Sequence, residues 1–239
     1  FMGILYVVSA LVILIMSAEH LLGAISLILS EAFSTQSVTG GMVGALVVGF
    51  QRAVFSNEAG IGSSSIAHSA VRTDEPASEG LVALLEPFID TVVICTLTSL
   101  VIVATAYPAG LMDSGLEGIE LTSAAFEHHI SWSPYPLALA GLLFAFSTTL
   151  AWSYYGLQGW IYLVGDSSLA QLGFKVVFCG FIVLGCMIQL TAVLDFSDAM
   201  VFLIAIPNII GLDFYAPLVK REVNQYLEKI RSGEIKKTG

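Results

Sequence analysis

Two polar segments interrupt otherwise apolar stretches of this sequence, and both carry groups that could bind a small solute or an ion. The first segment, Ser34–Gly41, separates the apolar runs Leu21–Phe33 and Met42–Phe50. At membrane depth its glycines and polar side chains would leave backbone groups that lipid cannot satisfy, so the segment would have to line a cavity or pack against protein. Secondary transporters use discontinuous helices of this kind to bind amino acids and sodium ions. The alternative is an extracellular loop between a surface helix and a short span, and composition favours neither.

The second segment contains the consecutive hydroxyl residues Ser147, Thr148 and Thr149 within an apolar run. Neighbouring helical positions are separated by about 100° around the axis, so the hydroxyls cannot all face one partner. Hydroxyl and carbonyl oxygens are hard ligands that suit an alkali cation. Trp152 lies one turn after Thr148 and shares its helix face. The pattern indicates an ion site beside an aromatic wall. The alternative is that the hydroxyls donate to carbonyls one turn earlier.

The composition indicates that membrane-spanning helices must position these groups. Of the 239 residues, 56% are hydrophobic and only 12% are charged, and the mean hydropathy is +0.85. A soluble domain carries about 25% charged residues. The net charge of −10 provides no basic patch for nucleic acid. This composition excludes a soluble enzyme, a disordered tail and a nucleic-acid binder. The spans contain no convergent histidines and carboxylates for a membrane-embedded enzyme, so we expect a protein that is not an enzyme.

Six apolar runs approach the length of about 20 residues that a helix needs to cross a bilayer. They are Phe1–Met16, Leu21–Phe55 with its interruption, Leu81–Tyr107, Leu137–Tyr155, Leu172–Leu190 and Ala199–Val219. Alternate connections hold all 9 basic residues, Lys175 among them, which predicts a cytoplasmic C-terminus. We therefore predict an all-α polytopic membrane domain over 1–219 and a cytoplasmic amphipathic tail over 220–239. The external connection Ser114–Ile130 is expected to contain a short helix.

Four further features outside these two segments have competing interpretations. The cytoplasmic stretch Ser56–Ser65 is either a hinge or inner gate, which we favour, or a capped turn. Asp90 lies in an apolar span, where an ionisable side chain suggests function; the alternative, which we favour, is a carboxylate near a helix N-terminus. Asn208 follows Pro207, so its amide is expected to bond the carbonyl that the proline frees. His68 lies in a connection and needs no role.

Several short strings carry a family resemblance. They are RAVFSNEAGIG over 52–62, IAH over 66–68, RTD over 72–74, FIDT over 88–91, CTLT over 95–98, WSYYG over 152–156 and IPN over 206–208. In this order they resemble the sodium:alanine symporter family, also called the alanine or glycine:cation symporters. The resemblance extends from Phe1 to about Arg231, and SNEAG followed by WSYYG is its most specific part.

The resemblance implies a leucine-transporter-like fold built from two inverted repeats. Phe1–Ser17 would be the last helix of the first repeat, and the remaining spans would form the complete second repeat with its broken first helix. The chain starts at Phe1 inside an apolar run, and we expect the true N-terminus and the N-terminal half of the protein to be missing. Because inverted repeats bury each other's faces, we expect the chain to be inactive without that half.

The resemblance also implies a substrate site. The broken segment around Thr39, Gly40 and Gly41, with Val43 one turn on, would face the substrate. Trp152 would close the side-chain pocket and restrict it to a small residue such as alanine or glycine.

A sodium site is implied in the same way. Thr148 and Thr149, with Ser147 as a neighbour, would bind the ion together with carbonyls from the missing half. The implied function is sodium-coupled symport of alanine or glycine across the inner (plasma) membrane by alternating access, with sodium as the coupling ion and no cofactor. One alternative is a proton-coupled transporter of the same fold that uses Asp90. Another is a non-transporting membrane subunit, in which Gln36–Gly41 would be an intact helix.

Overall fold

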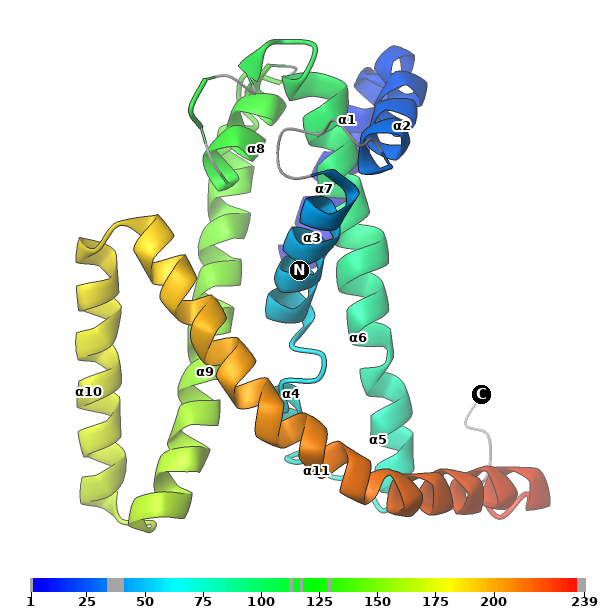
Figure 1. Ribbon diagram of the computed structural model, residues 1–239, viewed down its shortest axis with the longest axis vertical. Helices are drawn as coiled ribbons and strands as arrows, with labels where there is room; N and C mark the ends of the chain where they lie inside the picture. The colour runs from blue at the N-terminus through cyan, green and yellow to red at the C-terminus, as the bar shows by residue number, and fades with distance from the viewer. Residues whose placement is uncertain (1, 34–40, 112–113, 117, 129, 236–239) are drawn as a thin grey trace. The chain divides into compact units, whose positions relative to one another are not determined.

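The computed structural model of the protein is all-helical over the residues that it describes (Figure 1). These residues are 2–33, 41–111, 114–116, 118–128 and 130–235. The helices are α1 Met2–Met16, α2 Ala18–Ala32, α3 Gly41–Asn57, α4 Ser64–His68, α5 Pro76–Ala83, α6 Leu85–Pro87, α7 Thr96–Val101, α8 Ile119–Glu127, α9 Pro134–Val164, α10 Ser168–Met187 and α11 Leu190–Ser232, with the π-helical segments η1 Phe88–Cys95 and η2 Ile102–Ala106. The all-α prediction is confirmed for these residues.

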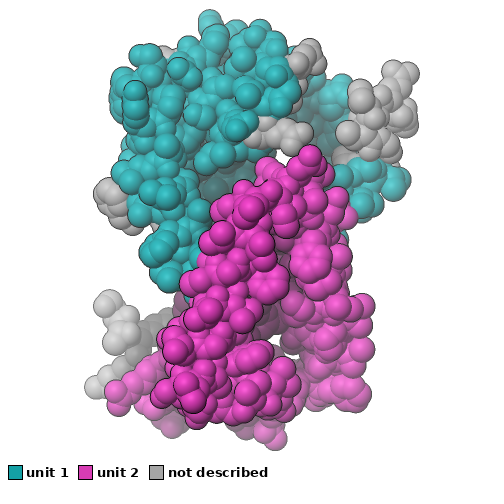
Figure 2. Space-filling model, turned by 90° about the vertical axis from the view of Figure 1, so that its left-hand side faces the viewer, with its two compact units in different colours: residues 1–50, 89–150 teal, residues 51–88, 151–239 magenta. Residues whose placement is uncertain are grey.

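The chain forms two compact units (Figure 2). Unit 1 comprises Phe1–Phe50 and Ile89–Leu150, and unit 2 comprises Gln51–Phe88 and Ala151–Gly239. The helix α9 therefore contributes its N-terminal part to unit 1 and its C-terminal part to unit 2.

Four helical runs among the described residues are long and apolar enough to cross a membrane. They are Pro76–Ala106, Pro134–Val164, Ser168–Met187 and Leu190–Ser232. A fifth would exist if α1 and α2 together form one span, although they meet at an angle of 102°. The prediction of six spans is too high for the described residues. The helices α1 and α2 have 15 residues each and α3 has 17, which is below the usual spanning length.

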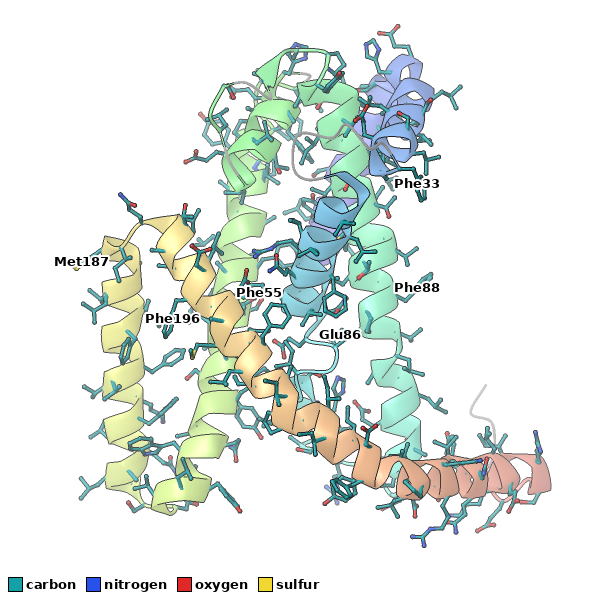
Figure 3. The ribbon with its side chains drawn as sticks, viewed as in Figure 1. Phe33, Phe55, Glu86, Phe88, Met187 and Phe196 are labelled. Carbon is teal, nitrogen blue, oxygen red and sulfur yellow. The ribbon has the colours of Figure 1, made fainter. Side chains whose placement is uncertain are left out.

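Large apolar side chains cover much of the surface of these helices. Phe33, Phe88 and Met187 are each more than half exposed (Figure 3). Such a surface is unfavourable in water but suits contact with lipid. The protein is therefore a multi-pass membrane protein.

The core of unit 1 forms where α1 packs on α7 and where α8 covers η2. Its buried residues are Ala10, Ile13, Leu14, Val101, Ala106, Ala125, Phe126 and Leu137. At the edge of this core, Tyr6 forms a hydrogen bond with the Thr98 hydroxyl, and its ring stacks on Phe126 at 6.4 Å. The helix α8 lies within the predicted external segment 114–130, so the short helix expected there is confirmed.

In unit 2, α10 packs antiparallel against the C-terminal part of α9 (Figure 1). The indole of Trp160 donates to the Ala170 carbonyl at 3.0 Å, and its ring contacts Phe174 at 6.2 Å. The Ser167 hydroxyl caps α10 by accepting from the Ala170 N–H. Because α10 begins at Ser168, Lys175 lies inside this helix, and its predicted position in a connection is wrong.

The last helix is longer than predicted. The residues expected to form a connection over 191–198 are helical, because α11 begins at Leu190. The helix then passes through Pro207 and Pro217 and continues to Ser232, so the expected tail helix is its C-terminal end. The residues that follow Pro217 are mostly strong helix formers, which favours this continuation. Gly233, at φ 77°, ends α11 in a left-handed conformation.

Two polar contacts join the C-terminal part of α3 and the loop that follows it to α11 within unit 2. The Arg52 guanidinium donates to the Asp198 carboxylate, and the Asn208 amide donates to the Gly60 carbonyl at 2.9 Å. The prediction that Asn208 bonds a carbonyl of its own helix is therefore wrong. Its partner lies in another segment of the chain, where a loop carbonyl has no helical donor.

The loop Glu58–Ser63 between α3 and α4 has an unusual but well-packed backbone. Glu58, Gly60 and Gly62 have φ values of 53°, 81° and 93°. Ile61 and Ser63 are buried, and the Ser63 hydroxyl donates to the Glu58 carboxylate at 2.6 Å. These contacts are those of the capped-turn alternative. The hinge function of this segment stays a prediction.

Replacing Gly62 by alanine should destabilise unit 2. An L-residue is strained at this positive φ, and the added Cβ would overlap the Asn208 side chain. The strain alone costs about 1–3 kcal/mol, so we expect a lower melting temperature for the purified chain in detergent. Gly80→Ala is the matched control, because its Cβ would meet no atom within 4 Å in helix α5. An unchanged melting temperature for Gly62→Ala would contradict the close approach of this loop to α11.

Candidate ion and substrate site

The hydroxyl cluster of α9 lies in an uninterrupted helix. Ser147 donates to the Phe144 carbonyl at 2.9 Å, and Thr149 donates to the Ala145 carbonyl at 2.8 Å. The alternative of bonding back to the preceding turn is therefore confirmed for these two side chains. A hydroxyl that donates still has lone pairs, so these bonds are compatible with an ion bound on the outer side of each oxygen.

Thr148 differs from its two neighbours. It is exposed, and its hydroxyl forms no hydrogen bond with the part of the chain that the structure describes. Among the hydroxyls of this cluster, it is the one with both its proton and its lone pairs available to a ligand. No group of three or more His, Cys, Asp or Glu side chains in the described ranges could hold a metal ion.

The predicted substrate-facing break lies only partly within the described residues. Thr39 and Gly40 are outside them, Gly41 is the first residue of α3, and Val43 lies in its first turn with an exposed side chain. The preceding helix α2 ends at Ala32. The predicted helical runs on both sides are thus confirmed. The first N–H groups of a helix have no intrahelical acceptor, so the start of α3 can bind a carboxylate.

Trp152 lines a cavity of about 570 Å³ within unit 2. The other lining residues are Ile61, Gly62, Ser63, Ile66, Tyr155, Gly156, Phe174, Phe178, Ile204, Pro207 and Asn208. The Trp152 ring meets Tyr155 edge to face at 5.8 Å. Trp152 and Thr148 lie one turn apart on α9, as their spacing predicts, although they belong to different compact units. The cavity is aromatic and of a size typical of small-molecule sites.

Asp90 lies in the π-helical segment η1, near the middle of the helical run Pro76–Ala106. The interpretation of Asp90 as a carboxylate near a helix N-terminus is therefore wrong, since the run starts well before it at Pro76. Asp90 lines a cavity of about 360 Å³ within unit 1, beside Tyr6 and Thr122. Single turns of π-helix frequently mark functional sites.

Two ionic clusters of unit 2 were not predicted from the sequence. His68 contacts both Glu79 and Glu86, and Arg52 pairs with Asp198. The signal available for the first cluster is the spacing of Glu79 and Glu86, which places them on one helix face about two turns apart. The ion pair of Arg52 has no comparable local signal, because 146 residues separate its partners.

Comparisons with known proteins agree with this picture. The model of the sodium:alanine symporter family matches residues 1–238. The sodium/alanine symporter AgcS of Methanococcus maripaludis is 36% identical over 239 residues, which cover 99% of this chain and 52% of AgcS. The probable sodium/glutamine symporter GlnT of Bacillus subtilis is 31% identical over 236 residues, covering 98% of this chain and 48% of GlnT.

A third relative is the putative sodium/proton-dependent alanine carrier protein YrbD of Bacillus subtilis. It is 32% identical over 191 residues, covering 74% of this chain and 40% of YrbD. The chain spans about half the length of AgcS and GlnT. Since the family match extends over nearly every residue, the chain belongs to the sodium:alanine symporter family.

Proposed function

We propose that this chain is the second half of a secondary transporter that couples sodium entry to the uptake of a small neutral amino acid, alanine or glycine, across the plasma membrane. The observation that carries the proposal is the family match over residues 1–238. The names of AgcS and GlnT, a sodium/alanine and a probable sodium/glutamine symporter, support it. No covalent chemistry is needed to drive uptake. Each sodium ion that enters releases about 2.3 kcal/mol per 100 mV of membrane potential, and this energy drives the transport.

The proposed fold is leucine-transporter-like. Phe1–Ser17 is the last helix of the first repeat, and the remaining helices form the second repeat. The chain spans about half the length of relatives such as AgcS, which supports the assignment of this chain to about one of the two repeats. Clustering of basic residues in the last helix beyond Val219 supports a cytoplasmic C-terminus.

In the proposed mechanism, the start of α3 binds the substrate carboxylate and the hydroxyl cluster of α9 binds sodium. The segment around Thr39, Gly40 and Gly41 faces the substrate, as the discontinuous helices of secondary transporters do. Thr148 and Thr149, with Ser147 as a neighbour, contribute neutral oxygens on one side of the ion, because hydroxyls from one helix cannot surround it. The missing half contributes the remaining oxygens.

Alternating access needs a segment that changes its backbone conformation. The loop Glu58–Ser63 suits this role, because hinges are short loops at the ends of helices. Gly60 and Gly62 tolerate φ values of either sign, and the Asn208 bond to Gly60 holds the loop in the conformation described here.

Thr148→Val should impair sodium coupling, because it removes the one unbonded hydroxyl of the cluster without changing the side-chain shape. In a full-length transporter that carries these residues, reconstituted in liposomes, we expect the sodium concentration for half-maximal alanine uptake to rise at least about tenfold, equivalent to about 1.4 kcal/mol. Thr96→Val, another exposed threonine in a membrane-spanning run, is the matched control and should behave as wild type. Equal sodium dependence of the two variants would show that Thr148 does not bind the ion.

Trp152→Ala should widen substrate selectivity if this ring closes the side-chain pocket. We expect glutamine to compete with radiolabelled alanine at about tenfold lower concentration than in the wild type, because the removed indole leaves room for a longer side chain. Trp132→Ala is the control, since Trp132 is exposed and lies before α9. A change in alanine affinity without any gain for larger amino acids would argue against this role of Trp152.

A second candidate function is proton-coupled transport through Asp90. The position of Asp90 in a cavity near the middle of a membrane-spanning run favours it. The name of YrbD, a putative sodium/proton-dependent carrier, also supports it.

Asp90→Asn distinguishes sodium coupling from proton coupling, because it removes the titratable proton of this side chain and keeps the side-chain size. Sodium coupling predicts that alanine uptake driven by a sodium gradient persists in Asp90→Asn. Proton coupling predicts that uptake driven by a pH gradient occurs in the wild type without sodium and disappears in the variant. Measuring uptake under each gradient alone decides between them.

A further inference from the structure

His68, the last residue of α4, lies between two carboxylates of the helical run that starts at α5. Its Nδ1 is 2.7 Å from Glu79 Oε1, and its Nε2 is 3.3 Å from Glu86 Oε2. Glu79 and Glu86 lie about two turns apart, so both side chains face α4. Figure 3 labels Glu86 where it projects from this run. The imidazole ring thus bridges two points of one helix face.

The two contacts of His68 require one more proton than a neutral imidazole carries. A neutral imidazole has a single N–H, and its other nitrogen accepts; an ionised carboxylate only accepts. Both nitrogens can donate to carboxylates only when the ring is an imidazolium. Glu86 is about half exposed, with 52% of its side chain accessible, so water stabilises its ionised form. The additional proton therefore belongs to His68.

The surroundings of the cluster are negatively charged. Glu58, in the loop before α4, lies within electrostatic reach of Glu86, and Tyr155 on α9 lies within reach of both. Hydrogen bonds with Glu79 and then Glu86 raise the pKa of His68, against a smaller effect of burial. Burial also raises the pKa of Glu58, and Glu86 adds to this rise. The two carboxylates that contact His68 thus favour its protonated form.

We propose that His68, Glu79 and Glu86 form a proton-binding site that fastens α4 to the start of the membrane-spanning run 76–106, and that loss of this proton as the pH rises releases α4. The site is separate from the proposed substrate and sodium residues, and it does not depend on the proposed function. The site also restrains the C-terminal end of the loop that precedes α4. The helix α4 directly follows the loop 58–63, which the Asn208 bond holds from the other side.

The ionisation of His68 can be measured directly on the purified chain. We expect the imidazole ¹⁵N signals of His68, assigned by their loss in His68→Gln, to titrate at a clearly higher pH than the ordinary histidine value of about 6.5. His20 offers a matched histidine substitution, because it contacts a single exposed carboxylate, Glu19, at 3.4 Å. Glu79→Gln should lower the His68 midpoint more than Glu86→Gln does, since the Glu79 contact is shorter and its side chain is less exposed. A wild-type His68 midpoint at or below the ordinary histidine value of about 6.5 would overturn the proposal.

The His68 site should also change how the stability of the protein depends on pH. A pKa raised above the unfolded value of about 6.5 contributes stability that is fully present below that pH and is lost as pH rises through the folded-state pKa. We expect the melting temperature of the wild type to fall over this interval relative to that of His68→Gln, while His20→Gln follows the wild type. Hydrogen exchange of residues 64–68 should show the same difference between variants at low pH and converge at high pH. A His68→Gln variant with the wild-type pH dependence in both measurements would contradict a role of this proton in holding α4.

Discussion

Hydrocarbon offers no hydrogen-bond partner to a peptide group, and the rest of this structure depends on that constraint. It makes the chain helical wherever it crosses the membrane and restricts irregular backbone to places where protein can satisfy it. The loop Glu58–Ser63 shows how this is achieved. Its carbonyl at Gly60 receives the Asn208 amide, and its hydroxyl at Ser63 bonds the Glu58 carboxylate.

The same constraint explains the hydroxyls of α9. Inside a membrane-spanning helix, a serine or threonine proton finds the carbonyl of the preceding turn, as Ser147 and Thr149 do. These bonds use the protons and leave the oxygen lone pairs, so a hydroxyl can be satisfied in the helix and still be an ion ligand. Structural and functional interpretations of such a cluster are therefore compatible. Thr148 distinguishes between them, because its hydroxyl forms no such bond with the described part of the chain.

In unit 2, charged side chains connect different segments of the chain. Arg52 pairs with Asp198, Lys229 Nζ contacts Glu75 at 2.6 Å, and His68 joins Glu79 and Glu86. Exposed ion pairs contribute little stability. The His68 cluster differs from the others because its imidazole loses its charge as the pH rises through the raised pKa of His68.

Composition and periodicity by themselves determined the membrane class, the helical runs on both sides of residues 34–40 and the short helix α8, and the motif strings indicated the family, because all of these depend on neighbouring residues. They misjudged lengths and ends: α11 continues through Pro207 and Pro217, and Asp90 lies deep within a helical run. Only the tertiary structure decided that the Asn208 amide donates to the Gly60 carbonyl, that Trp152 lines a cavity with the loop after α3, and that His68 lies between two carboxylates. Each of these contacts joins residues from different segments of the chain, and packing between segments, which no local pattern encodes, brings them together.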